Sequence, residues 1–329
     1  MTQLQSTLRF ARPVRLAAAV SLVLLALSAA ASAAEAQPSA AVSQPELAIT
    51  FDDLPAHSAL PPGETRVEIA DRIISALKAA GAPPIYGFVN GVREEQEPAS
   101  TPVLAAWRAA GFPLGNHTWS HMNLDTNSTG EFEADVVRNE PLLREEMGDA
   151  DWRWLRYPFL AEGDTPEKRR DVRAFLADRG YRIAGVTMSF ADFAFNEPYA
   201  RCIAKGDQQA ITTLERTYLD AADEEITRTR AMSRTLYGRD IPYVLLMHIG
   251  ALDSRMLPQL LDLYRSRGFK LVTLKKAERD PFYAQYLDPS LPAGPQSLER
   301  DMAAHGLAPL KPPVAKLKAM AMLEKVCRF

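Results

Sequence analysis

Short apolar runs alternate along the chain with longer segments whose apolar residues recur at helical spacing. The runs predict buried strands at residues 47–51, 85–89, 112–116, 154–157, 182–188, 243–247 and 270–274. The longer segments predict amphipathic helices at residues 64–80, 100–110, 128–147, 166–179, 208–236 and 253–267. Each predicted strand except the last is therefore followed by a helix.

This alternation predicts an α/β fold in which a parallel sheet is covered by helices. A closed barrel and an open doubly wound sheet both satisfy the pattern. After residue 275 the chain becomes rich in proline and loses its periodicity. We expect residues 276–329 to form a C-terminal extension packed on the outside, with a helix at 314–326.

The N-terminus carries a different pattern. Three arginines precede an apolar run at residues 16–31, and small residues suited to cleavage follow around Ala33 and Ala36. This layout is typical of a secretory signal peptide. A transmembrane anchor is the alternative, but the run is shorter than the ~20 apolar residues that a span needs. We expect a signal peptide at 1–36, a linker at 37–45, a secreted or periplasmic protein, and no stable membrane insertion after cleavage.

The charge of the chain bears on its class of partner, and its cysteines bear on whether it contains a disulfide. The chain has 38 basic and 41 acidic residues and lacks basic blocks, which argues against nucleic acid as a partner because such binding rests on neutralising phosphates. Cys202 and Cys327 are the two cysteines. In an exported chain they can form a disulfide, although two unpaired buried thiols fit the sequence nearly as well.

Polar residues that break the apolar pattern stand at the ends of four predicted strands. They are Asp52, Asp53, His117, His121, Arg156 and His248. Because the carboxyl ends of parallel strands converge on one face of a sheet or barrel, we expect these side chains to meet there.

Two of these residues have the spacing of metal ligands. His117 and His121 are four residues apart, and on a helical turn their rings would point the same way. Two imidazoles and one carboxylate form a facial metal site with positions left open for water. Solvated or capping histidines are the alternative. Only five histidines occur in the chain, and three of them lie at strand ends, which favours the metal site.

The adjacent acids Asp52 and Asp53 are open to two interpretations. Such a pair often caps a following helix or turn. Two neighbouring carboxylates that share one spot also raise a pKa through like-charge repulsion. A division of roles avoids this conflict, with one carboxylate binding the metal while the other acts as a general base.

Four short motifs, taken in order, resemble those of the polysaccharide deacetylases, the family-four carbohydrate esterases. They are Thr50–Asp53, His117–His121, Arg156–Phe159 and Leu246–His248. The resemblance covers residues 46–275, the expected catalytic domain. It implies a distorted (β/α)7 barrel of parallel strands with outer helices, to which the C-terminal extension is added.

The resemblance also implies a divalent metal ion, commonly zinc, as the cofactor. Asp53, His117 and His121 occupy the positions of the metal ligands.

The remaining motif residues take catalytic roles by the same resemblance. Asp52 would be the general base, and Arg156 would pair with it. His248 would be the general acid. The backbone N–H of Phe159 would help to hold the oxyanion.

The sequence departs from the family pattern at several places. Leu54-Pro55 stands where the family has Gly-Pro, and we expect this side chain to reshape the wall of the cleft. The motif that supplies a partner for His248 is poorly matched. Asp192 is the best candidate for that partner, with a helix or turn cap as the alternative. For His57 a surface loop is favoured over a place in the site.

Together these features predict a metal-dependent hydrolase of carbon–nitrogen bonds other than peptide bonds. Its substrate would be an acetylated poly- or oligosaccharide, chitin-like or peptidoglycan-like, from which it removes N-acetyl groups. An O-acetyl carbohydrate esterase, for example one acting on acetylated xylan, uses the same site and is the first alternative. A catalytically idle glycan-binding protein is the second, although binding alone requires neither a base nor an acid.

Overall fold

The computed structural model describes residues 44–312 and 320–328. The predicted signal peptide and most of the predicted linker lie outside the described residues, as does part of the helix predicted at 314–326. Residues 320–323 of that helix are helical. Among the described residues, no helix has both the length and the apolar character needed to cross a membrane.

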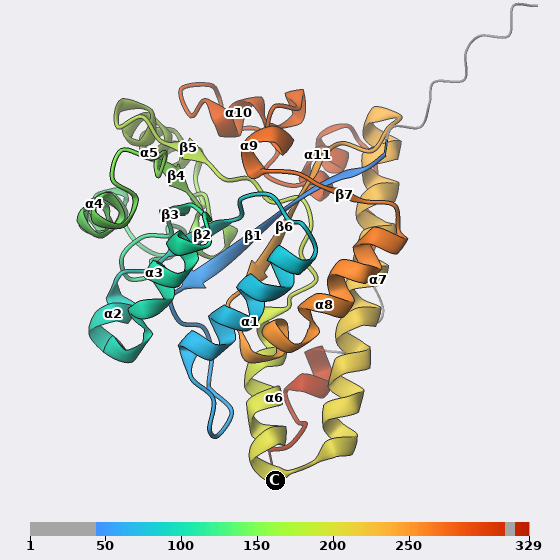
Figure 1. Cartoon of the computed structure of the whole chain (residues 1–329). Coiled ribbons are helices and arrows are strands. Elements are labelled where there is room, and N and C mark those ends of the chain that lie inside the picture. The colour runs from blue at the N-terminus through green and yellow to red at the C-terminus, as the bar shows by residue number, and fades with distance from the viewer. Residues whose placement is uncertain (1–43, 313–319, 329) are drawn as a thin grey trace, which may run out of the picture. The chain divides into compact units, whose positions relative to one another are not determined.

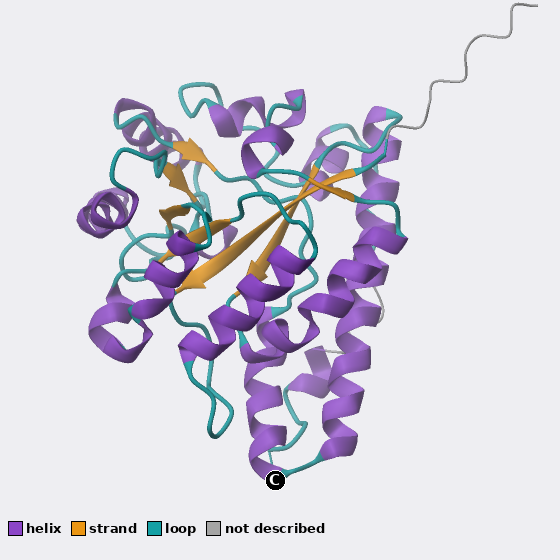
Figure 2. Ribbon diagram, viewed as in Figure 1, coloured by secondary structure: helices purple, strands orange, loops and turns teal. Residues whose placement is uncertain are grey.

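The centre of the fold is a seven-stranded parallel sheet (Figure 2). Its spatial order is β5-β4-β3-β2-β1-β6, and β7 pairs with β1. The strands are β1 (Glu46–Leu54), β2 (Tyr86–Val89), β3 (Leu114–Asn116), β4 (Trp154–Leu155), β5 (Arg182–Ile183), β6 (Tyr243–His248) and β7 (Lys270–Leu271). All seven overlap the segments where the sequence predicts strands, and β1 and β6 extend beyond the predicted bounds.

The chain after β5 brings the two edges of the sheet together. The amide of Ala184 donates to the carbonyl of Leu155 in β4 at 2.7 Å. A few residues later, the amide of Met188 donates to Val244 of β6, and the amide of Leu246 donates back to Met188, each at 3.1 Å. The predicted strand 182–188 is thus divided between two partners. The sheet curls into the distorted barrel that the family resemblance implies.

Helices surround the sheet (Figure 1). The six predicted helices are present as α1 (Arg66–Ala79), α3 (Pro102–Ala109), α4 (Thr129–Met147), α5 (Pro166–Asp178), α7 (Gln208–Tyr237) and α8 (Ala251–Ser266). The sequence pattern missed α2 (Val92–Gln96), α6 (Phe193–Lys205), α9 (Leu274–Ala277), α10 (Ala284–Leu287) and α11 (Leu298–Ala304). Three short 3-10 turns lie at Pro98–Ser100, Pro158–Leu160 and Pro281–Tyr283.

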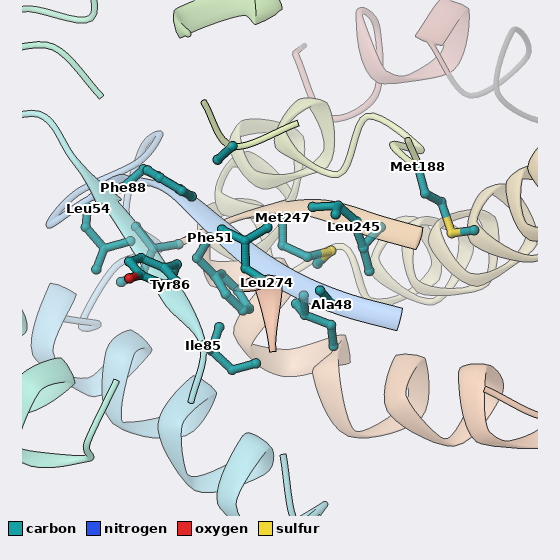
Figure 3. Close-up of a cluster of buried hydrophobic side chains, with 14 of the residues drawn as sticks. Ala48, Phe51, Leu54, Ile85, Tyr86, Phe88, Met188, Leu245, Met247 and Leu274 are labelled. Carbon is teal, nitrogen blue, oxygen red and sulfur yellow. The ribbon is translucent and has the colours of Figure 1, made fainter. Parts of the chain in front are cut away.

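The central strand β1 is buried on both faces, which explains why its sequence is a continuous apolar run rather than an alternating one. Residues 47–51 are at most 2% exposed. The apolar side chains of β1 lie among those of the neighbouring strands β2 and β6 (Figure 3). The one polar residue of this run is satisfied, since the hydroxyl of Thr50 donates to the carbonyl of Leu245 at 3.0 Å.

The sequence had suggested that the C-terminal extension packs on the outside of the fold. Part of it is buried instead. Tyr283 and Glu278 are fully buried. The Tyr283 hydroxyl donates to the carbonyl of Pro242 at 2.9 Å, and a Glu278 carboxyl oxygen accepts from the amide of Gly185 at 2.7 Å. Because Pro242 precedes β6, this part of the extension covers the amino ends of the strands, at the top of Figure 1.

The last residues of the chain are fastened to α6. Cys202 and Cys327 form a disulfide with a Cα–Cα distance of 5.2 Å, which confirms the pairing that the sequence left open. Arg201 donates to the carbonyl of Leu323 at 3.0 Å. Residues 320–328 are therefore tied both covalently and by a hydrogen bond to a helix that lies 125 residues earlier.

Candidate metal centre and its acid–base groups

Five of the six polar residues predicted at strand ends line one cavity of about 330 Å³ at the carboxyl ends of the strands, and the sixth, Arg156, is fully buried and donates to Asp52. The lining residues are Asp52, Asp53, His57, His117, His121, Tyr157, Phe159, Leu160, Ser189, Phe193, Leu246 and His248. Two larger pockets, of about 680 and 720 Å³, are lined mainly by residues of the helices around the sheet. Neither is lined by a predicted site residue. The chemistry is concentrated in the smaller cavity.

Both adjacent aspartates reach this cavity because the backbone changes conformation between them. Successive side chains of a regular strand point to opposite faces. Asp52 keeps the strand register and lies opposite His248 of β6. Asp53 has a φ of 63°, in the left-handed region that aspartate tolerates better than most residues. The pairing with β2 is irregular at the same place.

The residue after these aspartates does not shape the cavity, contrary to our expectation. Leu54 is fully buried and is absent from the lining of the cavity. Its side chain fills the space beside Gly87 of β2, where an added Cβ would lie 2.6 Å from the Leu54 Cδ2 atom. The Leu-Pro variant of the motif therefore contributes to the core rather than to the wall of the site.

Three side chains form a cluster suited to a metal ion. The Oδ1 atom of Asp53 lies 3.5 Å from Nε2 of His117 and 3.4 Å from Nε2 of His121. The three ligand atoms all lie within 4.8 Å of one another. The Oδ1 atom is buried and accepts no hydrogen bond from any described residue.

The segment that carries the two histidines is a loop and not the helical turn that their spacing suggested. Thr118 and His121 have φ angles of 59° and 60°, so the backbone adopts the left-handed conformation twice within this loop. This loop still aims both rings at Asp53. The two rings therefore lie together, as the spacing predicted, but they are carried by a loop and not by a helical turn.

Hydrogen bonding and burial prepare the imidazoles as ligands. Nδ1 of His117 lies 2.7 Å from the carbonyl of Arg156 and therefore donates its proton there, which leaves the Nε2 lone pair directed at the cluster. Burial, followed by the neighbouring His117, lowers the pKa of His121 to about 4. The His121 ring is thus neutral at neutral pH, the form in which imidazole binds metal.

The donor set fits a divalent metal ion. Two imidazole nitrogens and one carboxylate oxygen match the catalytic zinc sites that keep a position open. Metal–ligand bonds of ~2.0–2.2 Å place neighbouring tetrahedral ligands roughly 3.3–3.5 Å apart, close to the spacing here. The unpaired, buried Oδ1 atom supplies the charge that such an ion would balance.

Asp52 is held by a fully buried arginine. Nη1 of Arg156 donates to both carboxylate oxygens of Asp52, at 3.1 and 3.2 Å. The other guanidinium nitrogens donate to Thr50 at 3.0 Å and to the carbonyl of Ala184 at 2.9 Å. The arginine links β1, β4 and the segment after β5, so the whole end of the barrel fixes this carboxylate.

On the opposite side of the cluster, His248 is paired with Asp192. The backbone amide of His248 donates to Oδ2 of Asp192 at 2.6 Å, and its Nδ1 lies 3.1 Å from Oδ1. Asp192 makes no side-chain cap of α6, so the partner role is confirmed over the capping alternative. Burial alone would lower the pKa of His248, but Asp192, Asp53 and Asp52 outweigh it and raise the pKa to about 10.

His57, which the sequence placed on a surface loop, lines the cavity instead. Its Nδ1 lies 2.8 Å from Oδ2 of Asp53, and its ring centroid is 4.8 Å from that of His248. The side chain is 16% exposed. The one sequence signal for this contact was its position four residues after Asp53.

The mouth of the cavity is apolar. Phe159 has a φ of 58°, packs its ring against His121 at 4.4 Å, and is 65% exposed. Phe193 and Leu160 stand beside it and are also exposed. Phe193 packs edge-on against the ring of His248. Apart from Phe159, these rim residues were not predicted, since they follow no strand-end pattern.

Comparisons with known proteins bear on the family and the fold of this chain. A family model described as "Polysaccharide deacetylase" matches residues 39–191. The structure resembles a chitin deacetylase from the fungus Colletotrichum lindemuthianum, with 20% identity over 72% of this chain and 88% of that chain, and a TM-score of 0.50. At this identity the likeness indicates a shared fold.

Two bacterial structures are also similar. One is a CE4 family pseudoenzyme from Bacillus anthracis, with 15% identity over 72% of this chain and 66% of that chain, and a TM-score of 0.49. The other is the peptidoglycan deacetylase PdaC from Bacillus subtilis, with 19% identity over 72% and 91% of the two chains, and a TM-score of 0.46. No curated protein sequence gives a significant match.

Proposed function

We propose that the chain, whose residues 39–191 match the polysaccharide deacetylase family, is a member of carbohydrate esterase family 4 and a metal-dependent hydrolase that removes N-acetyl groups from an acetamido-sugar glycan. One observation carries this proposal. A buried carboxylate with its arginine and a histidine with its aspartate flank the Asp-His-His cluster within a single cavity.

Asp53, His117 and His121 would hold the metal ion. When bound there, a divalent ion such as zinc supplies Lewis acidity toward the acetyl carbonyl and makes a water molecule more acidic. The backbone N–H of Phe159 would add a hydrogen bond to the developing oxyanion, and one such donor is worth about 3–4 kcal/mol.

Asp52 is suited to the role of general base. Its carboxylate lies 3.8 Å from Nε2 of His117, beside the cluster and not within it. The fully buried Arg156 holds it in one orientation. A positioned carboxylate of this kind takes a proton from water as the water attacks, which contributes roughly 10²–10⁴-fold to the rate.

His248 is suited to the role of general acid because a pKa of about 10 keeps its ring protonated at neutral pH. Asp192 accepts from Nδ1, so the Nε2 proton is the one available for transfer. A departing amine needs this proton more than a departing alcohol does. The protonated ring therefore favours N-deacetylation over the O-acetyl esterase alternative, and a glycan-binding protein would have no use for it.

Acetate release from three substrates tests the proposal. We expect chitin oligomers or peptidoglycan fragments to lose acetate, the activity to disappear on chelation, and a divalent metal to restore it. Release from acetylated xylan alone would favour the esterase. Binding of glycans without acetate release from any substrate would favour the idle binding protein.

We further propose that the chain is exported to the periplasm or secreted after cleavage near residue 36. The Cys202–Cys327 disulfide supports this location, because such bonds persist in oxidising compartments. N-terminal sequencing of the extracytoplasmic protein should find a new terminus between residues 33 and 38. Protein that keeps its first residues, or that stays in the cytoplasm, would contradict export with cleavage.

A further inference from the structure

We propose that His57 is a positioning residue for the metal centre, which holds the Asp53 carboxylate so that a single oxygen faces the two metal-binding imidazoles. This inference rests on the proposed function, because it assumes that the cluster binds a metal ion. No motif of the family resemblance includes His57, and the assignment comes from its contacts.

The two oxygens of the Asp53 carboxylate have different surroundings. Oδ2 lies 2.8 Å from Nδ1 of His57. Oδ1 lies 3.5 and 3.4 Å from the Nε2 atoms of His117 and His121 and accepts no hydrogen bond from a described residue. Since an ionised carboxylate can only accept, His57 is the donor. The hydrogen bond occupies one oxygen and leaves the other for the ion.

The loop of His57 is itself held by Arg66, which forms a partly buried ion pair with Glu97. Arg66, the first residue of α1, donates to the carbonyl of His57 at 2.8 Å and to the carbonyl of Ser58 at 2.6 Å. Its Nε also donates to Glu97 at 3.0 Å, and its side chain is only 10% exposed. The loop that carries His57 is thereby tied to α1 and to the segment after α2, so the imidazole has little freedom to leave Asp53.

The physical effect of such a contact is on metal affinity. A buried carboxylate that has lost its donor can rotate about its Cβ–Cγ bond, so that the ligand geometry is less well defined before the ion arrives. Partners that orient a metal ligand in this way typically contribute 10–100-fold to affinity. His57 is not itself placed as a ligand, because the group of ligand atoms that lie within 4.8 Å of one another consists of Asp53, His117 and His121.

Zinc titration against a chromophoric chelator tests the assignment in full-length protein. We expect His57→Ala to weaken zinc binding about 10–100-fold. His57→Asn should recover most of that loss, because the Asn amide nitrogen can occupy the place of Nδ1. His57→Gln, whose amide is one carbon farther out, should recover less.

The chain provides a matched control for these variants. His305 also follows an aspartate at a spacing of four, with Nδ1 3.3 Å from Asp301, but it is largely exposed and lies in the C-terminal extension. His305→Ala should leave the zinc affinity unchanged. Thermal unfolding of the metal-free His57 variants should match wild type within a few degrees, which separates an effect on the site from an effect on folding.

Three results would overturn the inference, and they are distinguishable. If His57→Ala binds zinc as tightly as wild type, the positioning role is wrong while the metal site and the proposed function stand. If wild type binds no divalent metal, both the positioning role and the metal-dependent function are wrong. If His57→Asn binds zinc as weakly as His57→Ala does, a role that depends on the donated hydrogen bond would also be contradicted.

Discussion

Two neighbouring carboxylates face one cavity in this protein because the backbone of β1 leaves the strand conformation at Asp53. Asp52 remains in register with His248 and pairs with Arg156. Asp53 turns toward His117 and His121. The two acids therefore have different partners and can have different roles, although they are adjacent in the sequence.

Substitution of each aspartate by asparagine should separate these roles. Asp53→Asn removes a charged ligand, so metal content and activity should fall together. Asp52→Asn leaves the three ligands intact, so the metal should remain while kcat falls by about 10²–10⁴-fold. Metal content and kcat, measured on the same preparations, check both. Metal loss in Asp52→Asn with retention in Asp53→Asn would reverse the assignment.

The pairing of His248 with Asp192 has a consequence for pH dependence. The pKa of His248 is raised to about 10, above its ordinary value of about 6.5. The proton that it donates is therefore present at neutral pH and is lost as the pH rises through about 10. By linkage, the stability that this proton gives to the folded state is fully present below about pH 6.5. It is lost as the pH rises through about 10.

Asp192→Asn should shift this titration. Removal of an adjacent opposite charge lowers the pKa of a histidine by about 1–3 units. The alkaline limb of kcat/KM against pH should move down by that amount, and His248→Asn should abolish the limb along with most of the activity. An alkaline limb that stays in place in Asp192→Asn would show that another group controls it.

Strand-end placement predicted that six polar side chains would meet, because the carboxyl ends of parallel strands converge by the geometry of the fold. They are Asp52, Asp53, His117, His121, Arg156 and His248. His57 was assigned to the surface because its contact depends on tertiary structure. The anchor of its loop, Arg66, pairs with Glu97, which is 31 residues away. Neither residue belongs to a recognisable motif, so the sequence gave no sign of their combined effect.

At the scale of whole elements, periodicity predicted helices that pack one apolar face and failed where the helix sequence is unusual. Helix α4 begins with a capping box, Ser128 with Glu131, which is a local signal for a helix start. The missed helix α6 contains Pro198 after its first turn; an internal proline normally destabilises a helix, although the predicted helices α4 and α8 also contain one, Pro141 and Pro258. Burial of Phe195 and Tyr199 offsets that cost, which local sequence cannot show.

The close packing of β3 between its neighbours gives a prediction for this scale. A Cβ on Gly115 would lie 2.7 Å from the Phe88 ring and 2.9 Å from the carbonyl oxygen of Trp154. Gly115→Ala should therefore destabilise the fold by about 1–3 kcal/mol. Denaturant unfolding measures this change.

Gly130 of α4 is the matched control, since a Cβ there would meet nothing within 4 Å. Gly130→Ala should stabilise by about 0.4–1 kcal/mol through the loss of backbone freedom in the unfolded chain. Equal effects of the two substitutions would show that the spacing around Gly115 does not limit β3.

For the molecule as a whole, the disulfide between Cys202 and Cys327 closes a long loop with a sequence separation of 125. The chain-entropy model assigns about 4–5 kcal/mol to a loop of this length. Cys327→Ser should lower the free energy of unfolding by an amount of this order, and reduced wild type should behave like the variant. The measurement is denaturant unfolding with and without reductant.

Thiol titration provides the check on this bond. Unreduced wild type, once denatured, should show no free thiol, whereas Cys327→Ser should show one. Two titratable thiols in unreduced wild type would contradict the disulfide. Indistinguishable unfolding of the oxidised and reduced proteins would instead show that the bond forms without restraining the chain.

The order in which the strands pair has a further consequence for the newly made chain. The first strand, β1, pairs with β6 through contacts such as Thr50 with Leu245, which are 195 residues apart. Glu278 and Tyr283 then cover the amino ends of the strands. A ribosome therefore releases β1 and its neighbour β2 long before β6 and β7 exist, and completion of the barrel must wait until synthesis is nearly complete. A chain that stays unfolded for so long remains thin enough to be threaded through a translocation channel while it is still being made.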